Sequence, residues 1–265
     1  MRYCGVDISA RPGNQQLVTL HERRASEGGI ELVATFYEPG TVEQVARTIE
    51  GFGRGGAVVA VDAPSGPRLD LLAAGAPLRA ELGLPDGRYE RMRVCDALLF
   101  RRGLPLYPVP ASGQTPQGWE AWIGVGFELF AALSGLGLFR PVPADGHIAP
   151  VGTAALRFGR LCETYPDAIF CGLLGHRPPP KRTPWGLQQR IAALRMKGVH
   201  DEDGGLWHRT VDELDACAAA YTAYALSADL GVRVGAPEEG VIVLPVADLR
   251  GHYDNLPPPD RAALG

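Results

Sequence analysis

The sequence predicts an α/β fold built on a mixed β-sheet, and three observations near its start support this. Three strand-like segments open the chain, at residues 3–8, 16–21 and 30–38. A helical pattern follows over residues 41–51, and a continuous apolar run covers residues 57–61. The order of elements in this part of the chain is therefore β-β-β-α-β.

Local residue patterns predict each of these strands and the helix. The first three strands are β-branched or alternating, and turn-forming residues at 12–14 and 28–29 separate them, which predicts an antiparallel meander. Thr41 is placed to cap the helix, whose apolar residues fall on one face: Val42, Val45, Ala46 and Ile49. The apolar run is typical of a buried parallel strand, and Asp62-Ala63-Pro64 ends it.

The remainder of the chain is expected to complete the same domain, which we place over residues 1–265. Residues 64–157 are rich in Pro and Gly and contain one long helical stretch, so we interpret them as an insertion that covers the sheet edge. Regular structure then resumes with a strand, three helices and a last strand, at residues 160–164, 166–174, 184–197, 212–230 and 241–244.

Composition excludes several classes of protein. The formal net charge of −4 leaves no global basic field for non-specific nucleic-acid binding. The five cysteines form no Cys-x-x-Cys pair, which argues against structural zinc and for reduced thiols in the cytoplasm. No apolar run approaches the roughly 20 residues of a membrane span, so we expect no membrane partner.

Acidic residues stand where the apolar pattern predicts burial. If the fourth strand returns parallel to the first, Asp7 and Asp62 end neighbouring strands at the carboxyl edge of the sheet. Glu163 lies in the strand at 160–164, and Asp212 and Asp215 share one face of the helix at 212–230. Several buried carboxylates at one place require a cation, and an oxygen-only ligand set favours Mg²⁺ or Mn²⁺.

Each acid also has an ordinary structural interpretation. A single Asp at the end of a strand is usually a turn or cap residue. Glu163 can instead pair with an arginine, and Asp212 can be the N-cap of its helix.

The order and spacing of several short motifs resemble those of a known family. The chain is similar to the bacterial and archaeal domain-of-unknown-function family four hundred and twenty-nine, whose members are described as predicted nucleases of ribonuclease-H-like fold. The resemblance spans most of the chain and rests on Gly5-Val6-Asp7, Val61-Asp62-Ala63-Pro64, Arg93-Val94-Cys95-Asp96, Gly103-Leu104-Pro105-Leu106-Tyr107-Pro108, Glu163-Thr164-Tyr165-Pro166, Lys181, Asp215-Ala216, Ala219-Ala220-Tyr221-Thr222-Ala223 and Gly240-Val241-Ile242-Val243-Leu244-Pro245.

This resemblance implies a ribonuclease-H-like sheet with strand order 3-2-1-4-5 and a large insertion after the fourth strand. Asp7 and Asp62 would correspond to the acids of the first and fourth strands, and Asp212 and Asp215 to the paired acids on the last helix of Holliday-junction resolvases. Glu163 would join them from the fifth strand. The expected activity is two-metal hydrolysis of phosphodiester bonds in DNA or RNA, catalysed by Asp7, Asp62, Glu163 and Asp215 with Asp212 as a further metal-site residue.

A second group of residues is expected to contact substrate. Lys181 and Arg190, with Arg182 beside Lys181, form a small basic group suited to phosphate, and Arg93 lies in the motif that resembles the family's Arg-x-Cys-Asp segment. The alternatives are surface solubilisation for the basic group and a structural salt bridge between Arg93 and Asp96. Four tryptophans offer stacking surfaces for bases, although packing is their commoner role: Trp119, Trp122, Trp185 and Trp207.

Two rival functions remain open on the sequence alone. One is a non-catalytic ribonuclease-H-like scaffold that binds a partner protein or nucleic acid. The other is an actin-like or sugar-kinase-like phosphotransferase. The sequence shows no internal repeat and no glycine-rich turn after Asp7, and both absences argue against this function. Oligomeric state is also open, and resolvase-like enzymes of this fold often act as homodimers.

Overall fold

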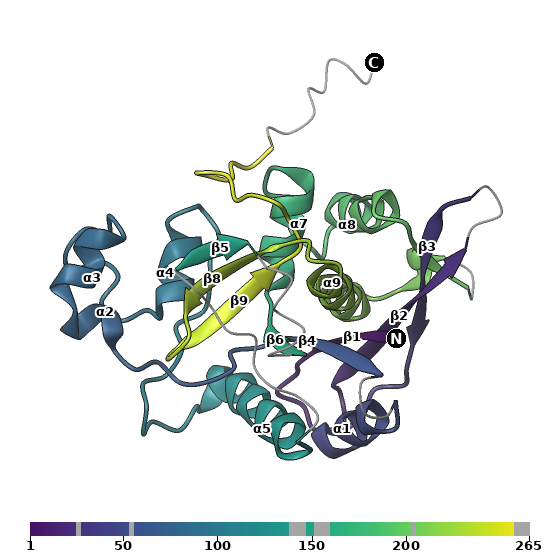
Figure 1. Ribbon diagram of the computed structural model, residues 1–265, viewed down its shortest axis with the longest axis horizontal. Helices are drawn as coiled ribbons and strands as arrows, with labels where there is room; N and C mark the ends of the chain where they lie inside the picture. The colour runs from purple at the N-terminus through teal and green to yellow at the C-terminus, as the bar shows by residue number, and fades with distance from the viewer. Residues whose placement is uncertain (25–27, 53–55, 138–146, 151–159, 203–204, 257–265) are drawn as a thin grey trace.

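The computed structural model describes residues 1–24, 28–52, 56–137, 147–150, 160–202 and 205–256. Within them the chain forms a nine-stranded mixed sheet with helices on both faces (Figure 1). The strand order across the sheet is β5-β8-β9-β6-β4-β1-β2-β3-β7. The strands are β1 Arg2–Asp7, β2 Gln16–Arg24, β3 Ile30–Phe36, β4 Ala57–Asp62, β5 Ile148–Pro150, β6 Leu161–Glu163, β7 Val199–Asp201, β8 Val232–Ala236 and β9 Gly240–Leu244.

The N-terminal half of the sheet confirms the predicted β-β-β-α-β order. Strands β1, β2 and β3 form an antiparallel meander, and β4 returns parallel to β1. Between β3 and β4 lies helix α1 (Val42–Glu50), which Thr41 caps through a reciprocal capping box with Gln44. The four apolar residues expected on one face of α1 are all buried.

The predicted strand order is present inside a larger sheet. The expected fifth strand is β6, so 3-2-1-4-5 corresponds to β3-β2-β1-β4-β6. Strand β7 extends the sheet beside β3, and β9, β8 and β5 extend it beyond β6. Sequence analysis missed β7 and β8, because β7 has only three residues and the pattern of β8 is interrupted by Arg233 and Gly235.

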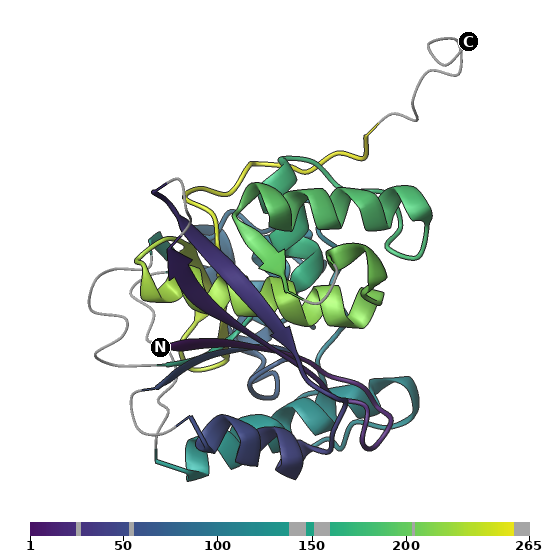
Figure 2. The same ribbon diagram turned by 90° about the vertical axis from the view of Figure 1, so that its right-hand side faces the viewer.

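Helices cover both faces of the sheet (Figure 2). The helices α7 (Pro166–Leu174), α8 (Pro184–Met196) and α9 (Val211–Ser227) lie on one side, with α9 directly on β1, β2 and β4. On the other side, α1 packs against α5 (Ala121–Gly135). Each side encloses its own apolar cluster, so the sheet is buried on both faces.

The long segment after β4 contains more regular structure than the sequence indicated. It includes α2 (Leu71–Ala74), α3 (Ala76–Glu81), α4 (Val94–Phe100), the short helix η1 (Gly118–Glu120) and α5. Strand β5 also belongs to it and pairs with β8, so the segment contributes to the central sheet. Residues 138–146 and 151–159 of the predicted insertion lie outside the described residues.

Three simple features complete this description. All five cysteines are buried and free, as the sequence predicted. Among the described helices, none combines the length and the apolar character that crossing a membrane requires. A further short helix, η2 (Leu206–His208), precedes α9.

Helix α9 approaches the sheet closely at Gly5 in the middle of β1. A Cβ atom on this residue would lie 2.0 Å from the carbonyl oxygen of Ala216 and 2.1 Å from the amide nitrogen of Ala220. These are backbone atoms of α9, so no side-chain rotation could relieve the clash. The absence of a side chain at Gly5 therefore sets the distance between α9 and the sheet.

We expect Gly5→Ala to lower the free energy of unfolding by about 3 kcal/mol or more, because α9 must move away from β1. Urea denaturation monitored by circular dichroism would measure the change. Gly29→Ala is the matched control, since a Cβ there meets no atom within 4 Å. Equal midpoints for the two variants would contradict the close packing at Gly5.

Candidate active site

Two aspartates stand side by side at the carboxyl edge of the sheet. Asp7 is the last residue of β1 and Asp62 the last of β4, and the two are paired in the parallel register. Residues paired in this way point to the same face of a sheet, and Gly5 shows that this face is the one covered by α9. The two half-buried carboxyl groups share a hydrogen bond.

Helix α9 brings a third aspartate near enough for its charge to act on both Asp7 and Asp62. Asp215 lies in its second turn and is only 1% exposed. Its Oδ2 accepts a hydrogen bond of 2.6 Å from Nζ of Lys181, whereas its buried Oδ1 has no hydrogen-bond partner among the described residues. Asp212, one turn earlier, is exposed, and its charge acts on Asp7.

The pKa values of these carboxyl groups are raised. Burial is the main cause for Asp7, whose pKa lies well above its usual value, and the charges of Asp62 and Asp215 add to the effect. Burial, together with the charge of Asp215, raises the pKa of Asp62 to about 8. Burial also raises the pKa of Asp215 to about 6, although Lys181 opposes this shift. The charged forms of these three carboxyl groups are therefore unfavourable in the free protein.

The chemistry of this group fits a hard divalent cation. Its ligand atoms are all carboxylate oxygens, as Mg²⁺ and Mn²⁺ prefer, and the unpartnered Oδ1 of Asp215 is a free ligand position. The other oxygen of Asp215, Oδ2, accepts the hydrogen bond from Lys181. Asp7, Asp62 and Asp215 would hold such a cation, which would compete with protons for these carboxyl groups and with Lys181 for Asp215.

Glu163 lies in a different cluster on the other face of the sheet. In the register it pairs with Val61 and not with Asp62, so its side chain points away from α9. It is buried and accepts hydrogen bonds of 2.9 and 2.6 Å from Nη1 and Nη2 of Arg93. Arg93 also donates to both oxygens of Asp96, each at 2.9 Å.

This second cluster already contains its neutralising cation. In the described part of the chain, Cys95, Asp96 and Glu163 are the one group of three possible metal-ligating side chains whose ligand atoms lie within 4.8 Å of one another. The Arg93 guanidinium is fully buried and binds both carboxylates, so the cluster is a satisfied ion-pair network. The structural alternatives for Glu163 and for Arg93 with Asp96 are thus confirmed.

The geometry therefore separates the residues that the sequence grouped together. It brings Asp7, Asp62 and Asp215 near one another, whereas Glu163 points to the other face of the sheet. There it has a structural partner, Arg93, that the predicted metal-site role did not include. Asp212 is not the N-cap of α9, because Thr210 caps that helix through a capping box with Glu213.

The two arginines expected to contact substrate, Arg93 and Arg190, instead form hydrogen bonds and ion pairs within the protein. Arg93 is 1% exposed and holds Glu163 and Asp96. Arg190 is also buried, and its Nη2 donates to Asp167 at 2.8 Å while Nη1 donates to the carbonyls of Pro179 and Gly186. Of the three predicted substrate contacts, Lys181 alone reaches the aspartates.

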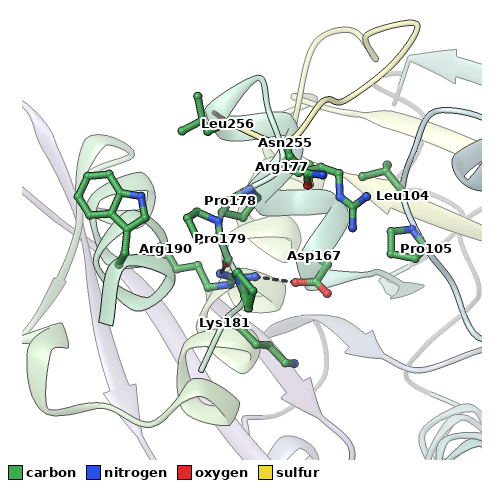
Figure 3. Close-up of a pocket in the computed structure, with 13 residues that line it drawn as sticks. Leu104, Pro105, Asp167, Arg177, Pro178, Pro179, Lys181, Arg190, Asn255 and Leu256 are labelled. Carbon is green, nitrogen blue, oxygen red and sulfur yellow. Dashed lines mark hydrogen bonds and ion pairs between the residues drawn. The ribbon is translucent and has the colours of Figure 1, made fainter. Parts of the chain in front are cut away.

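A pocket of about 730 Å³ lies next to the aspartates through Lys181, and Figure 3 shows the residues that line it. It shares Lys181 with them, and it also contains Asp167, whose charge raises the pKa values of Asp62 and Asp215. Arg177 and Trp185 line it as well. Asp167 and Arg177 were not among the residues predicted from the sequence. The one sequence feature that could have indicated Asp167 is its place as an acid in the first turn of a helix that follows the end of a strand.

Fold and site together define a class: an α/β protein whose carboxyl sheet edge carries a cluster of three aspartates beside a basic pocket. Within that class the chain belongs to the DUF429 family, described as a protein family of unknown function, whose model matches residues 5–240. No curated protein and no solved structure gives a significant match.

The Arg93 network yields a stability prediction. Arg93→Met should lower the free energy of unfolding by about 3–5 kcal/mol, because it leaves two buried carboxylates without a cation. Arg23→Met is the matched control, since Arg23 forms exposed ion pairs with Glu31 and Glu202 that should contribute at most about 1 kcal/mol. Urea denaturation would compare the two, and a small loss in Arg93→Met would contradict the structural role.

The raised pKa values predict how stability depends on pH in the presence of chelator. Between the usual carboxyl pKa near 4 and about 8, the folded state binds more protons at Asp7, Asp62 and Asp215 than the unfolded state does. These groups therefore make stability fall as pH rises through this window.

Asp62→Asn should remove part of this fall and raise the free energy of unfolding at pH 8 by about 1 kcal/mol or more relative to wild type. At pH 4 the two proteins should differ far less. Thermal denaturation at both pH values in EDTA would measure this, with Glu50→Gln, an exposed acid on α1, as control. A wild-type stability that rises from pH 5 to pH 8 would contradict the raised pKa values of Asp7, Asp62 and Asp215 in the folded protein.

Proposed function

We propose that this protein is a divalent-cation-dependent nuclease that hydrolyses phosphodiester bonds of nucleic acid. The observation that carries the proposal is the convergence of Asp7, Asp62 and Asp215 at one edge of the sheet. Three carboxylates at one place stabilise a divalent cation strongly and are unfavourable without one.

The arrangement also supports a ribonuclease-H-like relationship. The strands β3-β2-β1-β4-β6 have the order expected for that fold, and the acids stand at the ends of its first and fourth strands. A third acid comes from α9, the last helix of the described chain. Glu163 is left out of the proposed metal site because it is bound to Arg93.

Asp7, Asp62 and Asp215 would hold the metal ions, with Asp212 near enough to add negative charge at the rim. When bound, Mg²⁺ or Mn²⁺ lowers the pKa of an attacking water and offsets negative charge on the phosphate. Lys181 fixes Asp215 in the free protein, and once released it can donate a hydrogen bond to a phosphate oxygen.

The surroundings favour a nucleic-acid substrate over a small neutral ester. The adjoining pocket carries Arg177, Lys181 and Arg190 against the single carboxylate of Asp167. Such a local excess of cations attracts phosphate despite the net charge of −4 on the whole chain.

The test compares wild type with Asp7→Asn and Glu50→Gln on labelled single-stranded DNA, duplex DNA, RNA, RNA–DNA hybrid and a four-way junction. Each substrate is incubated with Mg²⁺, with Mn²⁺ or with chelator. We expect cleavage by wild type and Glu50→Gln with metal only, and a loss of at least about 100-fold in Asp7→Asn, as for removal of a residue that stabilises transition-state charge.

Metal binding provides a second measurement on the same proteins. Millimolar Mn²⁺ should raise the melting temperature of wild type and Glu50→Gln, and more at pH 8 than at pH 5.5, because the metal competes with protons for the carboxylates. Asp7→Asn should show a smaller shift. Cleavage that survives in Asp7→Asn would refute the proposed chemistry, and a folded wild type that neither binds metal nor cleaves would favour the scaffold function.

A further inference from the structure

We infer that the pocket beside the aspartates binds one unpaired nucleotide of a single-stranded substrate, with its phosphate on Arg177 and Lys181 and its base against Trp185. This inference rests on the proposed function, since it identifies the class of nucleic acid that the same site would cleave. It concerns the pocket drawn in Figure 3.

The position of the pocket suits a substrate that reaches the aspartates. Lys181 lines it and also bonds to Asp215, so a phosphate held by Lys181 lies next to the carboxylates. Asp167 belongs to the pocket wall and acts electrostatically on both Asp62 and Asp215. A nucleotide bound here would thus place an adjoining phosphodiester at the aspartate cluster.

Two of the three cations in the pocket are able to bind phosphate. Arg190 is held by Asp167 and by two backbone carbonyls, so it supports the wall (Figure 3). The guanidinium of Arg177 has no ion pair in the described residues, while its backbone N–H donates to the carbonyl of Asp254 and fixes its position. Lys181 is 39% exposed along its side chain and can turn from Asp215 to an incoming anion.

The other side of the pocket is apolar and aromatic. The lining includes Leu104, Pro105 and the prolines at 178–180, whose rings restrict the backbone. Cys171 adds a thiol that stays neutral, because burial raises its pKa to about 12. Trp185 is 49% exposed, so much of its indole is accessible to a ligand. An indole at the edge of a basic pocket offers a stacking surface for a base.

Size and shape favour a single unpaired nucleotide over a duplex. A volume of about 730 Å³ lies within the range of pockets that hold small organic ligands. A paired base is covered on both faces within its helix and cannot stack on Trp185 or enter the pocket without leaving its partner. The pocket therefore selects single strands or unpaired ends.

The experiment measures binding of a fluorescein-labelled single-stranded oligothymidylate by fluorescence anisotropy, with the full chain in EDTA so that no cleavage occurs. The variants are Arg177→Gln and Trp185→Ala. The matched controls are Arg182→Gln, which removes an exposed neighbouring cation outside the pocket lining, and Trp207→Ala, which removes an exposed indole elsewhere.

Trp185→Ala should weaken binding roughly 10-fold, as loss of one stacked base does. Arg177→Gln should weaken it by a similar factor and reduce the slope of log K against log salt concentration by about 0.7, the value for one phosphate contact to a single strand. The two controls should bind within about twofold of wild type, and a duplex of the same length should bind more weakly than the single strand.

Failure of this inference is distinguishable from failure of the proposed function. If wild type cleaves nucleic acid with Mg²⁺ but the two pocket variants bind and cleave like the controls, the pocket assignment is wrong and the nuclease stands. If the pocket variants lose binding while no metal-dependent cleavage occurs, the pocket assignment holds for a non-catalytic binder. Equal or tighter binding of the duplex by wild type would overturn the preference for single strands.

Discussion

The close approach of α9 to β1 is the constraint on which the rest of the structure depends. At Gly5 the helix backbone lies so near the strand that a single methyl group would collide with it. The residues of α9 that face the sheet are correspondingly small, with alanine at 216, 219, 220 and 223. This distance has a chemical consequence, because it lets the short side chain of Asp215 reach the edge where Asp7 and Asp62 end their strands.

Two groups of acids in the described residues lie on opposite faces of the sheet, and they differ in how the protein stabilises their charge. Glu163 and Asp96 share the guanidinium of Arg93, which satisfies both carboxylates within the protein. On the opposite face, Asp7, Asp62 and Asp215 have Lys181 as their close cation, and their pKa values are raised. The ionised forms of these three acids are therefore less stabilised by the protein than those of Glu163 and Asp96, and the metal site proposed above rests on this difference.

Much of the sheet was predictable because its signals are local. Alternation, turn residues and a capping threonine define β1 to β4, and the parallel return of β4 follows from the order of elements. The pairing of Asp7 with Asp62 then follows, since each ends its strand.

Glu163 could not be placed in the same way, because its face depends on a register shift of one residue between β4 and β6. No local pattern in the sequence sets that shift. Arg177 and Asp167 were missed for a related reason: they meet Lys181 only through the packing of α7, α8 and the segment at Asn255.

The carboxyl edge of the sheet carries the aspartates of the proposed metal site and is connected to one wall of the proposed nucleotide pocket. Strands β4 and β6 end side by side, and Tyr165 and α7 follow directly from β6. The hydroxyl of Tyr165 donates to the carbonyl of Pro105, which connects this edge to the loop that forms one wall of the pocket. The first turn of α7 supplies Asp167, which orients Arg190 and the proline wall beyond it. The backbone that ends the strands therefore also shapes the pocket, so the same rigid elements position the aspartates and the pocket in which the proposed substrate phosphate would bind.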